Sequence, residues 1–163
     1  MRTKSTRYLV QAAVIAAIYT ALTYAGFGFA YGPWQFRIAE ALCILPALTP
    51  AAIPGLTVGC ILANILSSYG ILDVIFGSLA TFLAAVSAYL LRGRKVKGMP
   101  LLSPLCAVLF NALIVSAVIV IASGQPHLYW INALQIGVTE AVVCYGLGLP
   151  LYHLIEKTDL LHL

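Results

Sequence analysis

The chain has 163 residues, of which 62% are hydrophobic and only 9% are charged. A soluble domain has about half apolar residues and roughly a quarter charged ones, so this chain has more apolar surface than one small core can bury. With a mean hydropathy of +1.00, the composition excludes a soluble enzyme domain, a disordered tail and a nucleic-acid-binding module. The net charge of +4 comes mainly from two basic clusters, Arg2, Lys4, Arg7 and Arg92, Arg94, Lys95, Lys97.

The predicted elements are apolar helices, and about 20 apolar residues suffice to cross a membrane. The first covers about residues 8–30, which is too long for the apolar part of a cleaved signal peptide. Further helices are predicted at about 38–48, 51–67, 71–91, 101–122 and 127–155, all in one integral membrane domain, 1–163. A turn signal at 123–126 separates the last two helices, and the last should be loosened near Gly146, Gly148 and Pro150.

The region 38–66, interrupted by Pro46, Pro50 and Pro54, decides the topology. As a single span it would place the two basic clusters on opposite faces, which the positive-inside rule disfavours. As two short helices it places both clusters and Lys157 in the cytoplasm. The sequence therefore predicts an all-α polytopic membrane protein with six transmembrane helices and cytoplasmic N and C termini. A re-entrant hairpin would also place both basic clusters on the same face of the membrane, and this alternative stays open.

Polar side chains inside these spans indicate a binding site. Charged groups in hydrocarbon are costly, so they usually face a cavity or a partner. Eight polar residues lie in or beside the spans. Glu140 and Asn111 lie near the middle of the membrane, and the other six fall in its predicted outer half. The six are Arg37, Glu40, Asn64, Asp73, Asn132 and Gln135.

Each of these residues also has a structural interpretation. Arg37 and Glu40, three residues apart, could form an ion pair on one helix face, in which Arg37 holds Glu40 ionised. Asp73 would be favoured by the dipole at the start of its helix. Asn64 and Asn111 could simply form hydrogen bonds between helices. Glu140, about 20 Å into its helix, needs a partner, a proton or a ligand.

The two tryptophans are candidate ligand contacts, and the four cysteines are candidates for a metal site. Trp34 and Trp130 could stack on a planar ligand or belong to an aromatic belt at the membrane surface. Cys43, Cys60, Cys106 and Cys144 form no CxxC pair and have no His at metal-ligand spacing. We interpret them as small buried hydrophobic residues, and expect neither a metal site nor a cofactor.

Two stripes of small residues allow helix backbones to approach closely. One consists of Ala13, Ala17 and Ala21; the other of Ala51, Gly55, Gly59, Ala63 and Ser67. Both packing within this chain and docking against another membrane subunit remain open for them. Because the chain has no P-loop and no hydrolase motif, it is not expected to be an enzyme. Active transport would need a partner that supplies energy.

Four segments in order carry a resemblance to a known family. They are 35–42 (QFRIAEAL), the turn 50–55 (PAAIPG), 72–81 (LDVIFGSLAT) and 140–150 (EAVVCYGLGLP). With them the chain resembles, over nearly its whole length, the QueT family of substrate-binding S-components of energy-coupling-factor (ECF) transporters.

The resemblance implies a subunit of the bacterial cell membrane that captures a queuosine precursor from outside. The implied ligand is a 7-deazaguanine, such as 7-aminomethyl-7-deazaguanine. The subunit would deliver it by toppling against a transmembrane coupling protein driven by two cytoplasmic ABC ATPases. Ala13, Ala17 and Ala21 would contact the coupling protein. The expected substrate-binding residues are Trp34, Arg37, Glu40, Asn64, Asp73, Asn111, Trp130, Asn132, Gln135 and Glu140.

Two alternatives to this function stay open. The same architecture could bind another vitamin, such as a thiamine- or flavin-like compound. The chain could instead be a small structural protein of membrane assemblies, although such a protein should not need several ionisable residues inside its spans.

Overall fold

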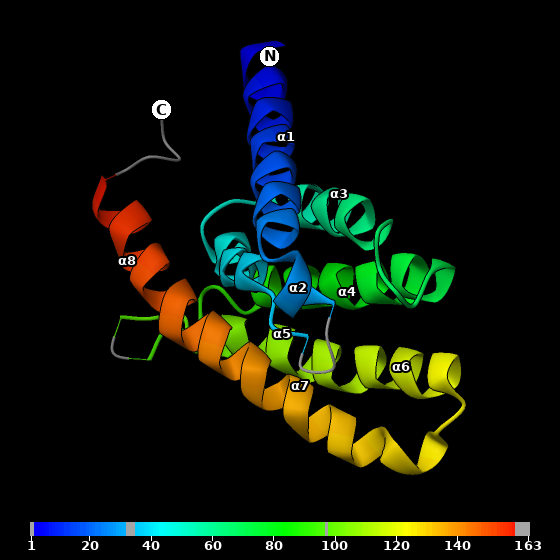
Figure 1. Ribbon diagram of the computed structural model, residues 1–163. Coiled ribbons are helices and arrows are strands. Elements are labelled where there is room, and N and C mark those ends of the chain that lie inside the picture. Colours follow the sequence, from blue (N-terminus) through cyan, green and yellow to red (C-terminus); the bar gives the residue numbers. More distant parts are fainter. Residues whose placement is uncertain (1, 32–34, 97, 159–163) are drawn as a thin grey trace.

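A computed structural model describes residues 2–31, 35–96 and 98–158, and this part of the chain is helical apart from turns and one isolated bridge (Figure 1). The start of α1 and the end of α8 lie at the same end of the molecule. The elements are α1 (Arg2–Ala25), α2 (Phe27–Ala30), η1 (Ile38–Ala47), α3 (Ala52–Asn64), η2 (Asp73–Gly77), α4 (Ser78–Leu90), α5 (Leu102–Phe110), η3 (Asn111–Val115), α6 (Ser116–Ser123), η4 (Pro126–Leu128), α7 (Tyr129–Val143), η5 (Cys144–Gly148) and α8 (Leu149–Thr158).

Four continuous helical stretches of the described chain are long and apolar enough to cross a membrane. They are Ser5–Ala25, Asp73–Leu90, Leu102–Ser123 and Pro126–Thr158. The region 38–66 forms two shorter apolar helices, η1 and α3, joined by a turn at Thr49–Ala51. With 10 residues in η1 and 13 in α3, each is about 20 Å long. Both are therefore shorter than the hydrocarbon core of a bilayer, which is about 30 Å.

The short helix η1 is a 3₁₀ helix rather than the predicted α-helix, and it lies in the middle of the bundle. Its residues from Ala39 to Pro46 are all buried. Its apolar side chains share one core with Tyr19 of α1, Leu56 of α3 and Tyr152 of α8. Apolar burial of this extent holds η1 in place, and with it the position of Glu40.

The helix α1 packs closely on α3 because α3 has glycines where the backbones meet. A Cβ atom on Gly55 would lie 2.8 Å from the carbonyl oxygen of Ala12, and one on Gly59 would lie 2.9 Å from Cβ of Tyr19. These contacts assign the small-residue stripe of α3 to packing inside this chain. The alanines of the other stripe, Ala13, Ala17 and Ala21, are exposed.

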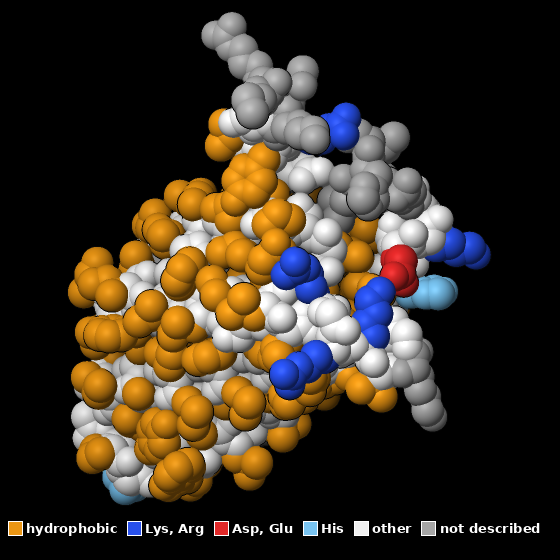
Figure 2. All heavy atoms as spheres, turned by 180° about the vertical axis from the view of Figure 1, so that it is seen from behind, with side chains coloured by type: hydrophobic (Ala, Val, Ile, Leu, Met, Phe, Trp, Pro, Cys, Tyr) orange, Lys and Arg blue, Asp and Glu red, His pale blue; other side chains and the backbone are white. Residues whose placement is uncertain are grey.

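The surface separates apolar and basic regions. In Figure 2 most of the visible face is covered by apolar side chains, and the Lys and Arg side chains gather toward one end. The exposed basic residues of the described chain include Arg7, Arg92, Arg94, Lys95 and Lys157. An apolar surface of this extent is suited to lipid.

Candidate ligand-binding site

The predicted polar residues lie where the helices depart from α geometry. Glu40 is in the 3₁₀ helix η1, and the π-helical turns η2 and η3 begin at Asp73 and Asn111. A third π turn, η5, begins at Cys144, one helical turn after Glu140. Single π turns inside helices are frequent at functional sites because the extra residue redirects nearby side chains.

One buried cluster surrounds Asp73. Its Oδ2 forms an ion pair with Nη2 of Arg37 at 3.0 Å and accepts a hydrogen bond from Ser67 Oγ at 2.6 Å. Asn64 Nδ2 donates to the Asp73 carbonyl oxygen at 2.9 Å, and Arg37 Nε donates to the carbonyl oxygen of Ala30 at 3.3 Å. These contacts fasten the segment before η1 to η2 and to the end of α3.

The structural interpretation of Arg37 and Glu40 as an ion pair is wrong, since Arg37 pairs with Asp73 instead. Spacing by three residues brings side chains together only inside a helix. Arg37 precedes η1 and is extended, with φ −105° and ψ 105°, so its side chain leaves in another direction. Arg37 is therefore not the residue that holds Glu40.

Glu40 has partners that the sequence did not reveal. The hydroxyl of Tyr19, on α1, donates to Oε1 of Glu40. The thiol of Cys43 donates to Oε2 at 2.9 Å. All three side chains are buried, so an acid in the centre of the bundle is held by a phenol and a thiol.

Glu140 lies beside Glu40, although 100 residues separate them in sequence. Asn111 Nδ2 donates to Oε1 of Glu140 at 3.1 Å. The Cys144 thiol lies 3.5 Å from Oε2 of Glu140 and 3.4 Å from the backbone oxygen of Glu40. One sulfur atom thus contacts both acidic residues. The hydrogen bond from Asn111 joins η3 to α7, which is the interhelical role that the sequence offered for Asn111.

Within the described chain, neither of these two carboxyl groups forms an ion pair. Arg37 pairs with Asp73, and Lys95 pairs with Glu156. A buried carboxyl group without a cation needs a bound proton or a partner with positive charge or N–H donors. The pair Glu40 and Glu140 is therefore suited to a ligand that supplies such donors.

Two amides of α7 extend this polar face toward the other end of the helix. Asn132 and Gln135 are half-buried, and they precede Glu140 by eight and five residues. An amide at either position can both donate a hydrogen bond to a ligand and accept one from it.

The two tryptophans differ in what the structure says about them. Trp34 lies outside the described residues. Trp130 is 74% exposed, and its ring packs edge-on against Tyr129 with centroids 4.9 Å apart. That position suits an aromatic residue at a membrane surface, and stacking on a ligand stays a prediction for both tryptophans.

Gln35 was missed in the sequence, as were the roles of Tyr19, Cys43, Ser67 and Cys144. Gln35 is buried and has a φ of 48°, in the left-handed region that side-chain-bearing residues rarely adopt. Such strain persists where surrounding structure enforces it, often at binding sites. In the described chain, its Nε2 atom is buried without a hydrogen-bond partner. Only its place in the segment 35–42 could have drawn attention to it.

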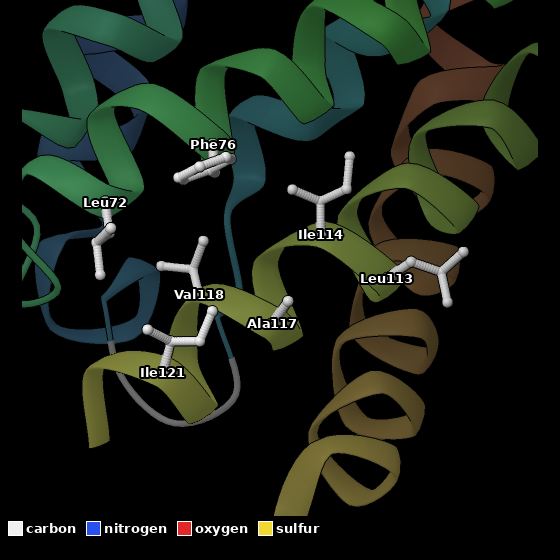
Figure 3. Close-up of a pocket in the computed structure, with 7 residues that line it drawn as sticks. All are labelled: Leu72, Phe76, Leu113, Ile114, Ala117, Val118 and Ile121. Carbon is white, nitrogen blue, oxygen red and sulfur yellow. The ribbon is translucent and has the colours of Figure 1, made fainter. Parts of the chain in front are cut away.

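A separate cavity of about 240 Å³ lies between the η2 region and the stretch formed by η3 and α6. In Figure 3 apolar side chains from the two sides point toward one another across it. The lining residues are Leu72, Phe76, Leu113, Ile114, Ala117, Val118 and Ile121. Since these side chains offer no hydrogen-bonding group, the cavity alone cannot recognise a polar ligand.

The fold defines a class: a multi-pass membrane protein of helices, with acids and amides buried between them. A family model described as QueT transporter matches residues 9–157. The chain therefore belongs to the QueT transporter family, as the segments of the sequence indicated.

A curated relative carries the same family name. The chain is 36% identical over 83 residues to the "Queuosine precursor transporter QueT" of Lactococcus lactis subsp. cremoris (strain MG1363). This match covers 50% of the chain and 48% of the relative, so the chain spans about half the length of that protein. No solved structure matches the chain.

Proposed function

We propose that this chain is the substrate-binding S-component of an ECF-type importer, and that it captures a queuosine precursor from outside a bacterial cell. It would work as one membrane domain with six transmembrane helices and both termini in the cytoplasm. The family match and the printed name of the Lactococcus relative support transport of a queuosine precursor.

The observation that carries this proposal is the pair of buried acids, Glu40 and Glu140, joined by Cys144 and flanked by amides. A 7-deazaguanine presents N–H donors along its guanine-like edge, and carboxylates accept them. Amides such as Asn132 and Gln135 could hydrogen-bond its carbonyl side. The aminomethyl cation of 7-aminomethyl-7-deazaguanine would favour a second carboxylate, which a neutral guanine would not need.

Energy for transport would come from partners. The chain contains no P-loop, so we assign ATP hydrolysis to two ABC ATPases and not to this subunit. We assign docking on the coupling protein to the exposed stripe of α1, Ala13, Ala17 and Ala21, because small side chains permit close sliding contact between helices. This subunit would be a carrier of its ligand, not an enzyme.

Binding by the purified subunit tests the proposal directly. Titration calorimetry with 7-aminomethyl-7-deazaguanine, guanine, thiamine and riboflavin should show selective tight binding of the deazaguanine. Glu40→Gln and Glu140→Gln should each weaken it about 10- to 100-fold, since hydrogen bonds to charged groups contribute about 1.5–3 kcal/mol. Glu156→Gln, at an exposed position, is the matched control and should bind normally.

Other results would redirect or reject the proposal. Tight binding of thiamine or riboflavin alone would keep the transporter class and change the substrate. If folded protein bound none of the four compounds, the S-component assignment would be rejected in favour of a structural role.

A further inference from the structure

Tyr19 joins the exposed helix α1 to the buried acid Glu40. Its side chain is fully buried, and its hydroxyl donates to Oε1 of Glu40. The Tyr19 phenol thus reaches from the outermost helix of the bundle into the proposed ligand site.

Other hydroxyl groups of α1 and of the segment after it use backbone acceptors. Tyr24 donates to the carbonyl oxygen of Leu62 at 2.6 Å, Thr20 to that of Gly59 at 3.2 Å, and Tyr31 to that of Ala63. A backbone carbonyl is therefore sufficient to satisfy a buried phenol here. Tyr19 instead donates to the carboxyl group of Glu40, which is a stronger acceptor than a backbone carbonyl when it is ionised. This difference indicates that the Tyr19 hydroxyl serves to hold Glu40.

The position of Tyr19 is set by the contact between α1 and α3. Gly59 lies against Tyr19 so closely that a Cβ there would be 2.9 Å from that of Tyr19. The opposite side of α1 carries exposed Ala13 and Ala17. The same helix thus has one side on Glu40 and the other free for a partner.

We propose that Tyr19 is a positioning residue: its hydroxyl holds Oε1 of Glu40, so that the carboxylate is aimed at the bound ligand. This inference rests on the proposed function. With Oε1 held by Tyr19, the carboxylate is ordered before the ligand arrives, and preorganisation of this kind raises affinity. Because the phenol belongs to α1, displacement of α1 along α3 would release Glu40 and weaken the hold on the ligand.

A double-mutant cycle tests this role. Tyr19→Phe removes only the hydroxyl and should weaken binding of 7-aminomethyl-7-deazaguanine about tenfold, as expected for a hydrogen bond to a charged group. Tyr24→Phe, the matched control on the same helix, should bind like the unmodified chain. In a Glu40→Gln background, Tyr19→Phe should add little, because residues that act through one another are not additive.

Each other outcome is decisive. Tyr19→Phe could bind normally, or it could weaken binding by the same factor in the Glu40→Gln background as in the unmodified chain. In either case Tyr19 does not act through Glu40, and the inference is overturned. An equal loss in Tyr24→Phe would show that α1 packing alone is responsible, and would overturn it too. If the unmodified, folded chain does not bind the compound, it is the proposed function that fails first, and the inference falls with it.

Discussion

Two ion pairs of nearly equal length show how burial decides what an ion pair contributes to stability. Arg37 and Asp73 are 3.0 Å apart, and their side chains are 5% and 0% exposed. Lys95 and Glu156 are 3.1 Å apart, and theirs are 42% and 45% exposed. Contacts with Tyr152 and Glu156 raise the pKa of Lys95 above its ordinary value. Water screens this exposed pair, whereas nothing replaces a lost partner in the buried pair.

We predict that Asp73→Asn lowers the free energy of unfolding by about 3–5 kcal/mol, because the buried Arg37 charge is left without its partner. Glu156→Gln should cost at most about 1 kcal/mol, as is typical of exposed pairs. Denaturant unfolding of the purified protein, followed by circular dichroism, measures both. Similar losses in the two variants would contradict the assignment of Arg37–Asp73 as a stabilising buried pair.

The sequence identified most of the buried polar residues but not their partners. Arg37, Asp73 and Glu140 stood out because an ionisable residue within an apolar run must have a partner. The partners depend on local backbone direction and on contacts between distant helices, which spacing cannot show. Whether Arg37 pairs with Glu40 or with a ligand therefore stayed open, and Tyr19 resembled any aromatic core residue.

At the scale of elements, helix positions were easier to predict than helix types. The sequence placed helices at 38–48 and 51–67, and the structure has η1 and α3 there. The predicted loosening near Gly146 is confirmed by the π turn η5. That η1 is a 3₁₀ helix could not be predicted, because a segment that is apolar on all sides has no periodicity to distinguish helix types.

The two stripes of small residues allow a prediction about α1 and α3. Gly59→Ala should destabilise the protein by about 1–3 kcal/mol, because the added methyl group meets Tyr19 and overpacks the contact. Ala17→Leu should leave stability unchanged, since Ala17 is exposed, yet reduce co-purification with the coupling protein. Thermal unfolding and affinity pull-down measure these two effects.

A matched control for the glycine is Gly146→Ala, where nothing lies within 4 Å of the new Cβ. It should be neutral or slightly stabilising because alanine favours helix by about 1 kcal/mol. Undiminished co-purification of Ala17→Leu would remove the docking role from the stripe of α1. A stable Gly59→Ala would show that α1 and α3 are less tightly packed than these distances imply.

At the scale of the whole molecule, the distribution of charge indicates an orientation. The exposed cations Arg7, Arg94 and Lys157 belong to three separate segments, yet Lys and Arg side chains gather toward one end of the face in Figure 2. Cytoplasmic loops carry such an excess of Lys and Arg. The turn between α6 and α7, which includes Gln125, lies at the other end of those helices from the loop with Arg94 (Figure 1).

We predict that this turn faces outward and that the basic loop faces the cytoplasm. In intact cells, a membrane-impermeant maleimide should label Gln125→Cys and not Arg94→Cys, whereas both should react once the membrane is opened. Both positions are exposed, and all four native cysteines are buried, so background labelling of the unmodified chain should be low. Labelling of Arg94→Cys in intact cells would invert the topology. The polar face of α7, where Asn132 lies two turns from Gln125, would then open toward the cytoplasm, and capture of a ligand from outside would be excluded.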